Sequence, residues 1–328
     1  MKNLSILSLF ICIGILCWGV STKYLGIDSR PNSKASASKF NQDELYKELE
    51  AFSKEHKIPA VDAKVDRVWK AIPGYNGLEV NIKASFEKMK VSGKLNPSEV
   101  IYQEISPSVH LEDLNPPQPI FRGNPEKPMI AFLINVAWGN EYIPDILDVL
   151  KKHQTKVSFF FDGSWVSKNP DMAKLIFEEG HEIGNHAYSH PDLQQKSEAE
   201  TVEELRKTNE IISKTLGIDP PKWFGPPSGS FNQQTVEVAD QLGMHTVLWT
   251  VDTVDWKKPA TTVMVNRVVS QVENGSMVLM HPTSPVAEGL EDMIMQIKEQ
   301  GYRLGTVSEL MSEKRLNGTV WDIEQIVK

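Results

Sequence analysis

The chain has 328 residues, of which 40% are hydrophobic, and its formal net charge is -8. This size and apolar content suit a globular protein with one large domain and a smaller unit, or with two domains. The acidic balance gives no electrostatic reason to bind nucleic acid, so we expect no nucleic-acid partner. Both cysteines, Cys12 and Cys17, lie in the N-terminal apolar run, so we expect no disulfide and no thiolate metal site in the rest of the chain.

The N-terminal stretch Leu4–Val20 is apolar and uncharged, and Lys2 precedes it. We therefore predict a signal peptide or a membrane anchor over residues 1–25, and we favour the anchor because no small-residue cleavage site follows closely. Either segment would place the rest of the chain outside the cytoplasm, anchored to the membrane or secreted. Residues 26–41 are rich in Ser, Lys and Asn, which predicts a flexible tether.

The next part of the chain predicts a small α/β module over residues 42–112. Apolar residues recur at three- and four-residue steps over 42–57, which indicates a helix, and residues 78–82 alternate as in a half-buried strand. The sequence assigns this module no function. Residues 113–127 are proline-rich and predict a stiff linker, and residues 317–328 are left as a C-terminal tail.

From residue 128 onward, apolar strand patterns alternate with helix patterns about seven times, which predicts a parallel sheet, open or closed into a (β/α) barrel. The predicted strands are 130–135, 157–161, 181–183, 223–224, 246–251, 277–280 and 302–304. The predicted helices begin near Pro144, Pro170, Ala199, Thr235, Val263 and Leu290. In such folds the chemistry collects at the C-terminal ends of the strands. We therefore expect the polar residues that follow these strands to share one rim.

Two histidines, His186 and His190, follow the third of these strands. Histidines four residues apart lie on the same side of a helical turn, where both imidazoles can reach one metal ion. Two surface histidines on a polar turn are the alternative. The metal interpretation gains weight if the other polar strand ends lie on the same rim.

Three segments, in this order, resemble the polysaccharide deacetylase family, carbohydrate esterases with a NodB homology domain. These segments are Gly184–His190, Trp249–Trp256 and Val278–Thr283. The resemblance implies a distorted (β/α) barrel of the NodB homology type over residues 128–316. It also implies a hydrolase of carbon–nitrogen bonds that removes N-acetyl groups from cell-wall polysaccharide. The run Asn135–Glu141 is most similar to the family's sporulation branch, and within it to YlxY-type members.

Two further family motifs are altered in this chain. Where the family has two adjacent aspartates, a general base and a metal ligand, this chain has Asn135 and Val136. An amide has no basicity near neutral pH, and an isopropyl group cannot ligate a cation. Gly225 replaces the arginine that pairs with the base in the family. The base aspartate and this arginine are lost together, so neither charge is left buried without its partner. We therefore expect weak catalysis or none.

The resemblance assigns roles to several residues that remain. His281 matches the general acid, and Asp252 would orient it. Trp256, Pro227 and Ser228 would contact substrate, with the Ser228 backbone N–H facing a developing oxyanion. The alternatives are structural: His281 as a strand-end cap, Asp252 as a loop cap and Trp256 as part of the core.

The same resemblance implies a divalent metal, zinc above all, held by His186 and His190. Two protein ligands fall short of the three that a catalytic zinc normally has. Asp162 could substitute for the missing ligand, because it ends a predicted strand on the same rim; its alternative is a plain Asp-Gly turn. Glu141 and Asp145 are weaker candidates, on the loop after the first predicted strand and on the first turn of the next helix.

Three functional hypotheses follow. In the first, the chain binds N-acetylated cell-wall glycan in a degraded deacetylase site. In the second, it is an active metal-dependent N-deacetylase of peptidoglycan or a chitin-like polymer. In the third, it is a structural or interaction protein of the spore envelope, with residues 42–112 as the binding part.

Overall fold

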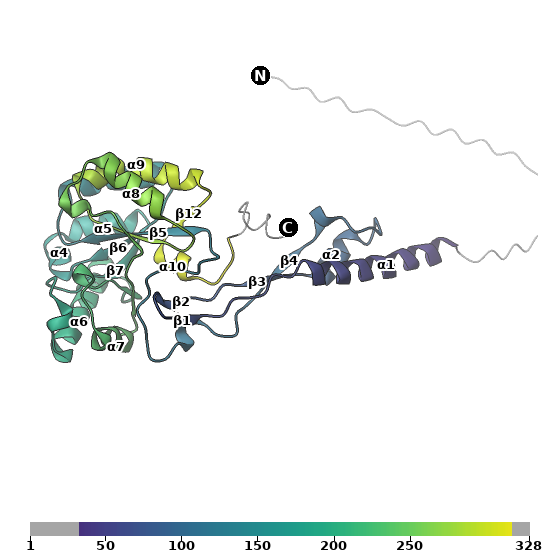
Figure 1. Ribbon diagram of the computed structural model, residues 1–328, viewed down its shortest axis with the longest axis horizontal. Helices are drawn as coiled ribbons and strands as arrows, with labels where there is room; N and C mark the ends of the chain where they lie inside the picture. The colour runs from purple at the N-terminus through teal and green to yellow at the C-terminus, as the bar shows by residue number, and fades with distance from the viewer. Residues whose placement is uncertain (1–32, 317–328) are drawn as a thin grey trace, which may run out of the picture.

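The computed structural model describes residues 33–316 of the chain (Figure 1). The predicted signal or anchor over residues 1–25 and the predicted tail over 317–328 therefore lie outside the described residues. The tether prediction is wrong for residues 33–41, which form the start of helix α1 (Ser33–Glu55); the remainder, 26–32, is not described. Among the helices of the described part, none is long and apolar enough to cross a bilayer.

The main domain is built on one curled sheet in which all the paired strands run parallel. The strand order is β10-β11-β5-β6-β7-β8-β9, and β12 pairs with β5 off this path. The strands are β5 (Met129–Val136), β6 (Ser158–Phe161), β7 (Glu182–Asn185), β8 (Trp223–Phe224), β9 (His245–Thr246), β10 (Val251–Asp252), β11 (Met277–Met280) and β12 (Arg303–Gly305). This sheet confirms the predicted distorted barrel. The single strand predicted over 246–251 is wrong, because β9 and β10 lie at opposite ends of the sheet.

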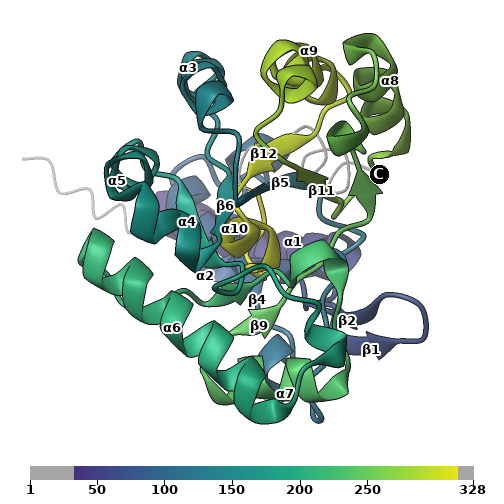
Figure 2. The same ribbon diagram turned by 90° about the vertical axis from the view of Figure 1, so that its left-hand side faces the viewer.

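Helices surround this sheet, as Figure 2 shows. They are α3 (Ile143–Lys152), α4 (Gly163–Lys168), α5 (Pro170–Glu178), α6 (Glu198–Leu216), α7 (Gln233–Gln241), α8 (Thr261–Gln271) and α9 (Ser284–Glu299). The last of these begins before the predicted start at Leu290, with Pro285 in its first turn, where proline costs no hydrogen bond. Gly289 lies inside α9 because α8 passes close to it: a Cβ there would lie 2.9 Å from Val265 Cγ2.

Alternate residues of β5 face opposite sides of the sheet. The outward-facing residues pack beneath the helices in the largest apolar cluster: Ile130, Phe132, Ile134 and Val136. Ala131 and Leu133 face the inside, where they meet the short helix α10 (Val307–Met311). In Figure 2, α10 lies within the ring of helices. It packs near the start of β5, so the inside of the sheet is left open at the strands' C-terminal ends.

The N-terminal part, predicted as a small α/β module, forms a small unit of helices and hairpins. Besides α1, it contains α2 (Ile82–Met89), the hairpin β1 (Lys64–Asp66) with β2 (Lys70–Ile72), and the hairpin β3 (Gly77–Val80) with β4 (Tyr102–Ile105). Its own apolar core consists of Leu45, Leu49, Val80 and Met89. This core is small, so the unit depends on contacts with the barrel for much of its burial.

The predicted linker lies on the barrel. Ile120, 1% exposed, donates its N–H to Thr246 O (2.9 Å) and accepts from Leu248 N (2.8 Å), so it covers the free edge of β9. The segment after α10 joins the module from the other side. Arg315 donates to Asn76 O (2.9 Å). These contacts hold the module and the barrel together, so residues 113–127 do not act as a free spacer.

Candidate functional site

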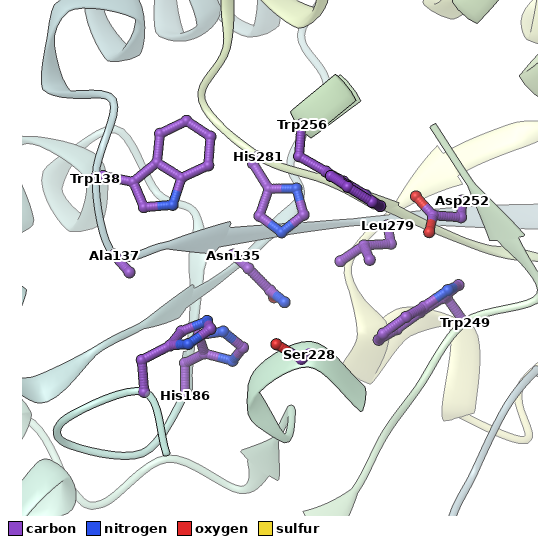
Figure 3. Close-up of a pocket in the computed structure, with 11 residues that line it drawn as sticks. Asn135, Ala137, Trp138, His186, Ser228, Trp249, Asp252, Trp256, Leu279 and His281 are labelled. Carbon is purple, nitrogen blue, oxygen red and sulfur yellow. The ribbon is translucent and has the colours of Figure 1, made fainter. Parts of the chain in front are cut away.

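A pocket of about 440 Å³ opens at the C-terminal rim of the sheet (Figure 3). Its polar lining consists of Asn135, His186, His190, Ser228, Asp252 and His281. Its apolar lining consists of Ala137, Trp138, Trp249, Trp256 and Leu279. Residues from widely separated parts of the chain therefore meet on one rim, as the strand pattern predicted. Pro227 is buried and Val136 lies in the core, and neither lines this pocket.

The two histidines of the pocket lie on a loop after β7, so the prediction of a helical turn is wrong. Ala187 (φ +58°) and His190 (φ +55°) have left-handed backbone conformations that no α-helix contains. Their rings still approach each other, with centroids 5.2 Å apart in an edge-to-face arrangement. The side chain of Asn185 supports the turn: it accepts from Ala187 N (2.8 Å) and donates to Leu205 O (2.8 Å).

A carboxylate on α6 holds the same loop from outside. Glu204 accepts the backbone N–H groups of Tyr188 (2.9 Å) and Ser189 (2.8 Å), and also the hydroxyl of Ser189 (2.7 Å). Hydrogen bonds to a charged group contribute about 1.5–3 kcal/mol each when they are well formed. Glu204 therefore helps to keep the strained loop in the shape that brings the two imidazoles together.

Replacing Glu204 with alanine is expected to loosen this loop. The backbone amides of Tyr188 and Ser189 lose their acceptor, so we expect their hydrogen exchange to accelerate by about tenfold or more, which corresponds to about 1.4 kcal/mol. Exchange measured by mass spectrometry or NMR checks this result. Glu203→Ala is the matched control, because Glu203 is a neighbour on α6 that pairs with Arg206 instead. Equal exchange in both variants would contradict the assignment.

His186 is held in the neutral form. It is 1% exposed, and burial lowers the pKa of His186 to about 3, with the neighbouring His190 acting in the same direction. Its Nδ1 lies 2.6 Å from Gly225 O; a carbonyl only accepts, so Nδ1 carries the hydrogen and donates. This leaves an Nε2 lone pair, the form of imidazole that a metal ion requires.

The remaining residues do not complete a three-ligand metal site. The Asp162 carboxylate is the N-cap of α4, accepting from Trp165 N (2.8 Å) and Ser164 Oγ (2.6 Å), and burial raises the pKa of Asp162. Within residues 33–316 no three His, Cys, Asp or Glu side chains are grouped so that they could hold a metal. The structure therefore does not support Asp162 as the substitute ligand. Two imidazoles are fewer than the three protein ligands of a catalytic zinc.

The carboxylate that contacts His281 belongs to Asp255, so the orienting role predicted for Asp252 is wrong. Asp255 is fully buried, its Oδ2 accepts from His281 N (3.0 Å), and the same oxygen lies 3.3 Å from His281 Nδ1. Thr253 Oγ1 also donates to it (2.5 Å). Asp252 instead accepts from Val254 N (2.7 Å) at the tight turn between the two aspartates. With Nδ1 directed at Asp255, Nε2 of His281 is left for the pocket.

Aromatic side chains form much of the pocket wall. Trp256 lines the pocket, as predicted, and is 53% exposed. Trp138 was not predicted as a site residue; it is 47% exposed and its ring is nearly parallel to that of His281. The signal available in the sequence was its place only two residues after the end of β5. Ser228 (φ +56°) lies on the turn Pro227–Gly229 and lines the opposite side.

Comparison with known proteins agrees with this geometry. A family model described as polysaccharide deacetylase matches residues 122–247. YlxY of Bacillus subtilis (strain 168) is 52% identical over 293 residues, which cover 89% of this chain and 90% of YlxY. The peptidoglycan-N-acetylmuramic acid deacetylase PdaA of the same organism is 34% identical over 200 residues, 60% of this chain and 76% of PdaA.

Solved structures give the same result. The crystal structure of wild-type BA3943 from Bacillus anthracis, described as a CE4 family pseudoenzyme, matches with a TM-score of 0.77 and 46% identity, over 83% of this chain and 96% of that chain. A mutant of BA3943 described as having restored enzymatic activity matches equally well, with 99% of its chain covered. The parallel sheet, the rim pocket and these similarities show that the chain belongs to the polysaccharide deacetylase family, in a form with a degraded catalytic site.

Proposed function

We propose that this chain binds N-acetylated cell-wall glycan in the rim pocket and has little or no deacetylase activity. The observation that carries the proposal is which functional groups this pocket keeps and which it lacks. The aromatic walls and the His281–Asp255 pair are kept, whereas Asn135 stands where the family's base would be. Since the Val136 side chain packs in the core, the chain also lacks the family's acidic metal ligand.

The chemistry of the pocket supports binding more than hydrolysis. A positioned general base contributes about 10²–10⁴-fold in rate, and an amide cannot supply it. The same amide is a good hydrogen-bond donor and acceptor for sugar hydroxyl and acetamido groups. Aromatic walls with a few placed polar groups are typical of sites that bind small organic ligands.

The proposal also covers the class of glycan and the location of the chain in the cell. The deacetylase PdaA is named for its action on peptidoglycan, and this supports a cell-wall glycan as the ligand of this chain. We place the chain outside the cytoplasm, attached to the membrane by its N-terminal apolar segment or secreted, and acting during sporulation. Cell fractionation during growth and during spore formation tests this placement.

The functional test measures binding and acetate release on the same purified protein. We expect the chain to bind N-acetylated peptidoglycan fragments and to release acetate no faster than buffer does. His281→Ala should then leave acetate release unchanged, since no turnover depends on it. Acetate release above background that disappears in His190→Ala would overturn the proposal in favour of an active, metal-dependent deacetylase. The restored activity of the BA3943 mutant supports the view that such scaffolds lack catalytic groups, not the ability to fold or bind.

A further inference from the structure

Trp138 lies at the mouth of the pocket with nearly half of its surface exposed. Tryptophan is enriched at contact surfaces, because its indole combines a large apolar face with a polar N–H. In Figure 3 its indole is seen face-on, next to the His281 ring, while Trp249 and Trp256 are seen edge-on across the pocket. The ring planes of Trp138 and His281 differ by 9°, with centroids 5.9 Å apart, so the two rings are nearly parallel neighbours.

The backbone around Trp138 is fixed in place. Gly139 (φ +86°) packs so closely on the segment after His281 that an added Cβ would lie 2.1 Å from Pro282 O. Asn140 is held by two side chains, accepting from Trp165 Nε1 (2.6 Å) and donating to Asn169 Oδ1 (2.6 Å). The exposure of Trp138 is therefore not that of a loose loop. A rigid support presents its ring, which lowers the entropy lost on binding a ligand.

We propose that Trp138 is a sugar-stacking platform that adds a second subsite beside the pocket, for the neighbouring residue of an N-acetylated β-linked glycan. This inference rests on the proposed function. A pocket of this volume holds only a small part of a polymer, so the rest of a bound glycan chain must extend across the rim. The C–H face of a pyranose ring is apolar and flat, and it matches the face of an indole. The His281 edge beside it offers a polar group to the hydroxyls at the rim of that sugar.

The test compares glycans of different length. The probes are N-acetylglucosamine and its β-1,4-linked tetramer, and dissociation constants are measured by isothermal titration calorimetry. We expect Trp138→Ala to weaken binding of the tetramer by about tenfold, which corresponds to about 1.4 kcal/mol, and to weaken binding of the monosaccharide much less, because the rest of the pocket wall remains. Trp138→Phe, which keeps a flat ring, should retain most of the tetramer affinity.

The matched control is Trp69→Ala. Trp69 lies on the β1–β2 turn with Arg122 over its ring, away from the pocket, so this variant should bind the tetramer as the unmodified chain does. Equal tetramer affinity in Trp138→Ala and the unmodified chain overturns the inference and leaves the proposed function standing. Failure of the unmodified chain to bind either sugar overturns both. A change in oligomeric state of Trp138→Ala without a change in tetramer affinity also overturns the inference, because it assigns the indole to a contact between copies.

Discussion

Replacing Asn135 with aspartate is expected to raise acetate release from N-acetylated glycan by about 10²–10⁴-fold over the unmodified chain, the usual contribution of a positioned general base. Asn135 lies on the inner face at the end of β5, and Figure 3 shows its amide between His186 and His281. Aspartate has nearly the same shape. It therefore places a basic oxygen in the pocket without disturbing the strand that carries it.

The gain in acetate release of Asn135→Asp should increase with pH. Position 135 is only 6% exposed, and Gly225 provides no cation beside it. Burial without a partner raises the pKa of a carboxyl group. Since only the deprotonated form acts as a base, the gain should grow as the pH rises through this raised pKa. Adding Gly225→Arg should shift the gain to lower pH; its Cβ would lie 3.1 Å from Phe160 Cδ1, so that ring must move by a few tenths of an ångström.

Two controls separate the restored base from other effects. Asn135→Ser removes the amide without adding a carboxylate, so it should stay at background. Adding His281→Ala to Asn135→Asp should remove the gain, because the leaving amine then lacks its proton donor. If Asn135→Asp stays at background at every pH, with and without Gly225→Arg, the missing base is not what limits this site.

The fold could be predicted from the sequence because its strongest signals are local. The buried strands β5 and β6 are uninterrupted apolar runs, and helix patterns with proline or glycine at their ends separate them. The polar residues that follow these strands could be placed on one rim for the same reason, since parallel strands end at one edge.

The shape of the histidine loop and the choice of aspartate beside His281 depend on contacts that the spacing of residues in the sequence does not reveal. A four-residue spacing of histidines fits a helical turn, but Asn185 and the distant Glu204 hold the loop in another shape. Likewise, Asp252 and Asp255 flank one tight turn that contains the left-handed Val254 (φ +54°), and it is the Asp255 carboxylate that faces His281. The spacing of the two aspartates is the same in either case.

Replacing Val136 with aspartate is expected to make the stability of the chain depend on metal. Val136 is fully buried in the main apolar cluster, so in the presence of a chelator an aspartate there should lower the free energy of unfolding by at least about 2 kcal/mol. The resemblance implies that this position supplies the family's acidic metal ligand; because Val136 faces the outer cluster, the end of β5 must turn for an aspartate to reach the two imidazoles. If the new carboxylate reaches them, zinc at 1,000 times its dissociation constant should return about 4 kcal/mol. Thermal unfolding with zinc and with chelator measures both effects.

The effect of zinc on the unmodified chain is the reference for this experiment. With two imidazoles and no acid, the unmodified chain should show little change in melting temperature on adding zinc. Val136→Asn is the matched control, because it buries a polar group of the same shape without a charge and should be destabilised without recovery. Adding His190→Ala to Val136→Asp should abolish the recovery. If zinc stabilises the unmodified chain as strongly as Val136→Asp, the two histidines already hold a metal together with a further ligand, and the two-ligand interpretation is wrong.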